Sequence, residues 1–133
     1  DRGDPRPQAR PVIRAAALAL MALAAPAAAQ TPPLLCLGTQ PPFLLAARPG
    51  ADGTARATFD YLGDGTFDFA PMPEPGLTFS RHTLSTAGGP IDVFLEARAC
   101  PALGMELPVT IQMGIPASGG IVTFLGCCLW QDG

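Results

Sequence analysis

The chain contains no lysine, a single histidine and only eight basic residues, all of them arginine. Four of the arginines lie within the first 14 positions, and the other four are spread singly over the rest of the chain. Proteins bind nucleic acids and anionic membrane surfaces through clusters of positive charge. Because the main part of the chain has no such cluster, we expect neither nucleic acid nor an anionic membrane surface as a partner.

The sequence also lacks the motifs that carry metal binding and redox chemistry. There is no C-x-x-C pair, and His82 has no second metal-ligating residue nearby in the sequence. Asp60, Asp64 and Asp68 recur every four residues, but they do not have the spacing of a calcium-binding EF-hand loop. We interpret these aspartates as solvated carboxylates of a hairpin, and we expect no metal and no cofactor.

Catalytic motifs are missing as well. Ser80 and His82 are two residues apart and share a face if the segment is a strand, but no G-x-S-x-G nucleophile elbow is present. We therefore interpret His82 as a surface-strand histidine. Asp92 and Glu96 also share a strand face, which is typical of a solvated surface and is not sufficient evidence for a glycosidase pair. No catalytic residue is predicted, and the chain is expected not to be an enzyme.

The first 29 residues have the features of a secretory signal peptide. Arg10 and Arg14 precede the apolar run 15–25, and small residues follow in Pro26-Ala27-Ala28-Ala29. The run of 11 residues is shorter than the ~20 that a membrane-spanning helix needs. We expect cleavage after Ala29 and no stable membrane anchor afterwards, with residues 1–8 as upstream sequence. Export to the periplasm or the exterior follows from this interpretation.

The remaining segment, residues 30–133, has the size of one small domain. It carries four arginines and nine acidic residues, which gives a net charge of −5. A basic periplasmic or extracellular protein is therefore the partner that its charge favours, and we expect the domain to be a monomer.

Four cysteines, at positions 36, 100, 127 and 128, predict two disulfides in an oxidising compartment. A bond between the neighbours Cys127 and Cys128 would require a strained ring, which leaves two pairings open. In both of them, Cys36 and Cys100 are each tied to one member of the adjacent pair. If that pair lies on a strand, its side chains point to opposite faces, so one bridge is buried and the other lies nearer solvent.

Short runs of alternating apolar and polar residues, separated by glycine and proline, predict an all-β domain. About seven antiparallel strands are expected, and they must close into a small barrel or fold into a sandwich. A loop is expected at residues 100–106, with a short helical turn within residues 99–105 as the alternative. The expected strands are 43–48, 55–62, 66–70, 77–85, 91–99, 107–113 and 120–127.

Three segments resemble motifs of a family of uncharacterised small exported bacterial proteins. Residues 36–43 resemble the family's C-x-G-x-x-P-F-W opening, residues 100–110 resemble its C-x-D-G-M-S and Y-P segments, and Gly126-Cys127-Cys128 resembles its ending. The resemblance implies a small β-barrel, grouped with lysozyme-inhibitor and META-type domains, and no established activity. Leu44 stands where the family has tryptophan. Leu103 and Glu106 stand in place of its aspartate and serine, so if those polar residues bind a ligand in the family, we expect that binding to be lost here.

These observations favour a non-catalytic exported domain that binds or scaffolds. One alternative is an inhibitor that inserts an exposed loop, either 71–76 or 114–119, into a cationic wall-degrading enzyme such as lysozyme. Another is a lipocalin-like barrel with an apolar cavity formed by Phe59, Phe67, Phe69 and Phe94.

Overall fold

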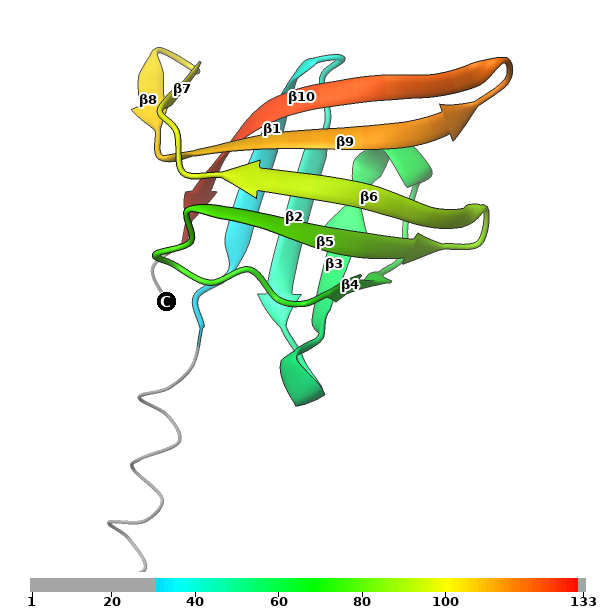
Figure 1. Cartoon of the computed structure of the whole chain (residues 1–133), viewed down its shortest axis with the longest axis horizontal. Helices are drawn as coiled ribbons and strands as arrows, with labels where there is room; N and C mark the ends of the chain where they lie inside the picture. Colours follow the sequence, from blue (N-terminus) through cyan, green and yellow to red (C-terminus); the bar gives the residue numbers. More distant parts are fainter. Residues whose placement is uncertain (1–30, 132–133) are drawn as a thin grey trace, which may run out of the picture. The chain divides into compact units, whose positions relative to one another are not determined.

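The computed structural model describes residues 31–131, and the signal peptide expected at residues 1–29 lies outside this range. Eight strands form a closed antiparallel barrel in the order β1-β10-β9-β6-β5-β4-β3-β2, and β7 pairs with β8 in a separate two-stranded hairpin (Figure 1). The all-β prediction is confirmed, and the barrel is the closure that forms. The strands are β1 (Leu34–Gln40), β2 (Leu44–Pro49), β3 (Ala55–Phe59), β4 (Phe67–Ala70), β5 (Phe79–Thr86), β6 (Gly89–Glu96), β7 (Cys100–Ala102), β8 (Met105–Leu107), β9 (Val109–Ala117) and β10 (Gly120–Trp130).

Strict alternation along the strands fills the barrel with apolar side chains. In β6, Ile91, Val93 and Leu95 are buried while their neighbours face outward. An eight-stranded barrel has an interior that side chains can fill. Here the buried rings of Phe59 and Phe124 pack against each other with their centroids 6.3 Å apart, within one cluster of apolar side chains. The interior is therefore a solid core.

The four phenylalanines expected to line a cavity have different environments. Phe59 and Phe69 are fully buried and belong to the packed core. Phe67 is only partly buried and packs against the edge of that core. Phe94 faces outward and stacks on Phe79, with ring centroids 6.1 Å apart. The prediction of one cavity formed by all four side chains is therefore wrong.

One barrel strand was not expected from the sequence. Strand β1 pairs with β10 on one side and with β2 on the other, and it closes the barrel. Its Leu35 and Leu37 lie on the outward face and are half-buried. Apolar residues on both faces remove the alternation by which the other strands are recognised.

Two segments that were expected to be irregular are paired strands. Residues 114–117, expected as part of a loop, continue β9 and pair with the start of β10. The expected loop or helical turn near Cys100 is the hairpin of β7 and β8, which turns at Leu103 and Gly104. The opposite error occurs at β3: the strand was expected to continue to Leu62, but it ends at Phe59 and is followed by the 3₁₀ turn η3 (Asp60–Leu62).

The proline-rich segment 71–76 is a loop, as predicted, and it connects β4 to β5. Its Met72 and Pro73 side chains are buried, whereas its other four residues are exposed. The Met72 amide donates a hydrogen bond to the Gly53 carbonyl, 2.9 Å away, in the 3₁₀ turn η2 (Ala51–Gly53). The loop therefore packs over one end of the barrel.

Candidate functional site

The adjacent cysteines lie on β10 and point to opposite faces of the sheet, as expected for neighbours on a strand. Cys128 points into the barrel and forms a disulfide with Cys36 of β1, its direct partner in the strand register. Both residues are fully buried. This disulfide links the paired strands β1 and β10 covalently.

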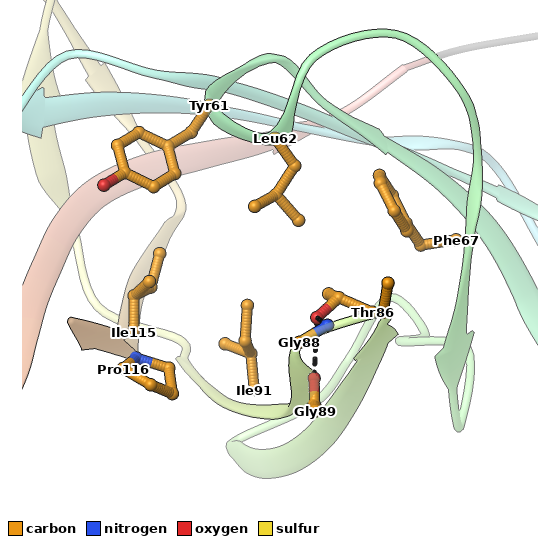
Figure 2. Close-up of a pocket in the computed structure, with 10 residues that line it drawn as sticks. Tyr61, Leu62, Phe67, Thr86, Gly88, Gly89, Ile91, Ile115 and Pro116 are labelled. Atoms are coloured by element: carbon orange, nitrogen blue, oxygen red, sulfur yellow. Dashed lines mark hydrogen bonds between the residues drawn. The ribbon is translucent and has the colours of Figure 1, made fainter. Parts of the chain in front are cut away.

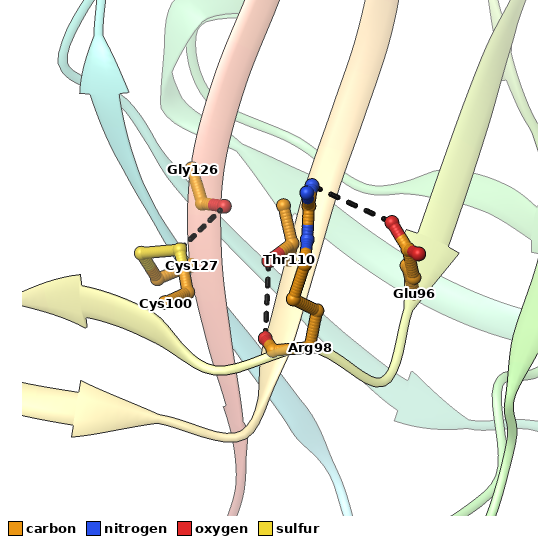
Figure 3. Close-up of polar contacts among 6 residues, drawn as sticks. All are labelled: Glu96, Arg98, Cys100, Thr110, Gly126 and Cys127. Carbon is orange, nitrogen blue, oxygen red and sulfur yellow. Dashed lines mark hydrogen bonds and ion pairs between the residues drawn. A yellow bond between two sulfur atoms is a disulfide. The ribbon is translucent and has the colours of Figure 1, made fainter.

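Cys127 points outward and forms the second disulfide with Cys100 of β7. It thereby holds the β7–β8 hairpin against the outer face of β10. Figure 3 shows this disulfide. The Gly126 carbonyl oxygen lies 3.3 Å from the Cys100 sulfur. Of the two pairings that the sequence left open, the structure has 36–128 and 100–127.

The base of the hairpin is fixed by two further contacts, which are also drawn in Figure 3. The Thr110 hydroxyl donates a hydrogen bond of 3.1 Å to the Arg98 carbonyl. The Arg98 guanidinium forms an ion pair with Glu96 at 3.4 Å. The segment that leads from β6 into β7 is thus tied to both β6 and β9.

The tip of the hairpin is apolar and exposed. Leu103 is 76% exposed and Met105 is 55% exposed, and the hairpin extends away from the barrel (Figure 1). Leu103 has a φ of 54° and Gly104 a φ of 72°, so both residues of the turn are in the left-handed region. A leucine in this region is strained, whereas asparagine, aspartate and glycine adopt it readily. The hairpin therefore presents an apolar side chain at a place where neither the turn nor the core requires one.

A second feature is an apolar pocket at one mouth of the barrel, with a volume of about 260 Å³ (Figure 2). Ile91 of β6 and Ile115 of β9 are its buried residues. Leu62 of η3 and Phe67 of β4 lie opposite them, and the Tyr61 ring lies at the edge. No charged side chain lines this pocket.

Ser80 and His82 lie on the same face of β5, as expected, near the opposite end of the barrel. The Ser80 hydroxyl oxygen is 2.6 Å from the His82 Nε2, and the His82 Nδ1 is 2.5 Å from the Pro71 carbonyl oxygen. The tautomer with hydrogen on Nδ1 donates to Pro71 and accepts from Ser80. His82 is only 2% exposed, so its interpretation as a surface residue is wrong. Burial lowers the pKa of His82, and the hydrogen bond to Pro71 opposes this effect.

The acidic residues singled out in the sequence are exposed and separately engaged. Asp60 accepts a hydrogen bond of 2.9 Å from the Leu44 amide, and Asp68 pairs with Arg56. Asp92 forms an ion pair of 3.2 Å with Arg81 on the outer face of the sheet, and Asp64 is exposed between η3 and β4. Within residues 31–131, no three histidine, cysteine or acidic side chains gather in a metal-binding arrangement.

Neither the known protein-family models nor the curated proteins and solved structures yielded a match to this chain. The resemblance to the family of small exported bacterial proteins therefore stays a prediction. In the described part of the chain, no helix has the length and apolarity needed to cross a membrane.

The hairpin tip was missed in the sequence, although its turn glycine is visible there. The dipeptide Leu103-Gly104 separates two three-residue strands, which are too short to show alternation. The mouth pocket has no sequence signal, because its side chains come from η3, β4, β6 and β9.

Proposed function

We propose that this protein is an exported, non-catalytic binding domain whose β7–β8 hairpin inserts into an apolar recess of a basic protein. The observation that carries the proposal is the exposed Leu103, held in a left-handed conformation on a hairpin that a disulfide fixes to the barrel. Backbone strain of this kind is concentrated at functional sites. A cationic wall-degrading enzyme such as lysozyme is the class of partner that we favour.

The tip has the energetic features of a binding element. Holding leucine in the left-handed region costs about 1–2 kcal/mol. Full burial of an exposed leucine or methionine side chain in a partner gains about 1.5–3 kcal/mol each. The strain of Leu103 is already present in the unbound domain, so it does not reduce the free energy gained when Leu103 and Met105 are buried in a partner. The disulfide lowers the entropy lost when the hairpin is immobilised.

The charge of the domain supports a basic partner. Residues 31–131 contain eight acidic side chains and four arginines, and three of the arginines are paired with Asp68, Asp92 and Glu96. Glu106 is exposed next to Met105 and makes no ion pair within the described residues. A cation at the rim of the partner's recess would face this carboxylate, and the overall negative charge would accelerate the encounter.

Two disulfides in one small domain support a location in the periplasm or outside the cell, where such bonds persist. The expected signal peptide leads to the same location. The Ser80–His82 pair gives no support to hydrolysis, because the position that a carboxylate takes in a serine-hydrolase triad is occupied by the Pro71 carbonyl.

The proposal is tested by measuring the binding of lysozyme to the oxidised domain by calorimetry, together with lysis of cell walls. Wild type should form a complex and slow lysis, and Leu103→Asn should weaken binding by about tenfold or more, because a desolvated anchor is lost. The same variant should melt a few degrees higher, since relief of about 1 kcal/mol raises the melting temperature by about 4–8 °C in a domain of this size.

Ile121→Asn is the matched control, because Ile121 is 73% exposed on β10, at the opposite end of that strand from Cys127. It should bind lysozyme as wild type does. The proposal is wrong if wild type forms no complex with lysozyme at micromolar concentrations, or if the two asparagine variants bind equally well.

A further inference from the structure

We infer that the mouth pocket is a second binding site, for a small apolar molecule that is neutral or positively charged. This mouth pocket, lined by residues of η3, β4, β6 and β9 and by the β5–β6 turn, is separate from the β7–β8 hairpin. An aromatic molecule of one or two rings, or an amphiphile with a short alkyl chain, has the required size and chemistry.

The shape of the pocket limits where a ligand can lie. Ile91 and Ile115 are 3% and 4% exposed and separate the pocket from the packed interior. Beyond them the barrel is filled by buried side chains, Phe124 and Met113 among them. A ligand is therefore held at the mouth and cannot enter the barrel axis, in contrast to the deep cavity of a lipocalin.

The volume sets the size of the ligand. A dry cavity of about 150 Å³ lined by aliphatic and aromatic side chains accepts one benzene ring. The mouth pocket is larger, at about 260 Å³, and opens to solvent. It therefore accommodates a naphthalene-sized group or an octyl chain that folds against Leu62 and Phe67, with any polar group of the ligand left at the opening.

The polar groups at the opening indicate how such a ligand is oriented. The Thr86 hydroxyl is occupied, because it donates to the Gly89 carbonyl at 2.7 Å and accepts from the Gly88 amide at 3.2 Å. The Tyr61 hydroxyl makes no hydrogen bond to the other residues drawn in Figure 2. It is thus the group that can contact the polar end of a ligand.

The charges beside the pocket select against anions. None of the lining residues is charged, and Asp60 and Asp64 lie on the same short segment as Tyr61 and Leu62. No arginine lines the pocket, and Arg56 on β3, the strand that pairs with β4, is held by Asp68 and Thr66. A carboxylate at the opening would therefore meet negative charge with no cation in the pocket lining, so alkyl alcohols and amines should bind better than fatty acids.

The inference is tested by titrating the oxidised domain with the neutral dye N-phenyl-1-naphthylamine and recording its fluorescence. Wild type should bind the dye saturably, and Leu62→Trp should weaken binding by about tenfold, because the larger side chain fills the pocket. Leu125→Trp, on the outer face of β10, is the matched control and should bind as wild type does. Leu103→Asn should also leave dye binding unchanged, which separates this site from the hairpin.

Competition identifies the ligand class. Octanol and octylamine should displace the dye at lower concentrations than octanoate at neutral pH. If Leu62→Trp does not fold, the side-chain methyl resonances of Ile91 and Ile115 in the wild-type protein should shift when octanol is added. Absence of dye binding, equal binding by the two tryptophan variants, unshifted methyl resonances, or displacement by octanoate as effective as by octylamine would overturn the inference.

Discussion

Removing the Cys36–Cys128 disulfide, by replacing both residues with alanine, should lower the free energy of unfolding more than removing Cys100–Cys127 in the same way. The two bonds span 92 and 27 residues of the chain. The entropy of closing loops of these lengths corresponds to about 4.7 and about 3.6 kcal/mol at 25 °C. The difference of about 1 kcal/mol is a lower bound, because the first pair also loses two sulfur atoms from the packed core.

Urea denaturation of the oxidised wild type and of the two double variants measures these costs. Each variant keeps its other disulfide, so the comparison isolates one bridge at a time. The denatured chains are less compact once a bridge is gone, which raises the slope of unfolding free energy against urea. The extrapolated free energies should therefore be compared, not the midpoints alone.

The two variants should also differ in binding. Without Cys100–Cys127 the barrel remains closed by Cys36–Cys128, but the β7–β8 hairpin is no longer fixed to β10. We expect this variant to lose affinity for lysozyme while keeping the mouth pocket. The reasoning is refuted if removal of Cys100–Cys127 costs more stability than removal of Cys36–Cys128.

Three further changes test the packing of the domain. The free energy of unfolding should fall as the pH drops below 6.5. Burial lowers the pKa of His82 below that value in the folded domain, so the unfolded chain takes up a proton that the folded domain does not. Melting curves of His82→Gln recorded over the same pH range should lack this pH dependence. Gly126→Ala should lower the free energy of unfolding, measured in urea, by about 1–3 kcal/mol, because the added Cβ would clash with the Leu37 carbonyl oxygen. Gly88→Ala is the control: the atom nearest to its added Cβ is 3.9 Å away, so the free energy of unfolding should change by no more than about 0.5 kcal/mol. Replacing Arg56 by methionine should change the unfolding free energy by less than about 1 kcal/mol, because its ion pair is half-exposed.

The barrel strands that alternate clearly could be predicted from the sequence. In β6 and β3, one face is buried in the core and the other is solvated, so the buried side chains of Ile91, Val93 and Phe59 follow from the period of two. Strand β1 could not be recognised in this way, since Leu35 on its outward face is also apolar.

Glycine and proline misled the prediction at the end of β9. Gly114 is the last residue of β9 that pairs with β6, and residues 115–117 pair with β10 alone. With one side of the strand free, Pro116 needs no hydrogen-bond donor there and does not interrupt the pairing. Whether residues 115–117 have one neighbouring strand or two depends on the relative lengths of β6, β9 and β10, which cannot be deduced from the sequence around Pro116.

The cysteine pairing and the candidate site needed the three-dimensional arrangement. Opposite directions for Cys127 and Cys128 follow from a strand, but their partners depend on β1 being the neighbour of β10. The hairpin tip escaped detection because leucine is not a residue that favours a left-handed turn. The position that breaks the local rule is the one to which we assign function.

The measurement that tests the central claim most directly is an NMR titration of the isotope-labelled oxidised domain with unlabelled lysozyme. Binding through the hairpin predicts that the largest amide shifts fall within residues 100–107, on β7, its turn and β8. Shifts concentrated in the loop 71–76 or at the mouth pocket, or no shifts at all, would contradict it.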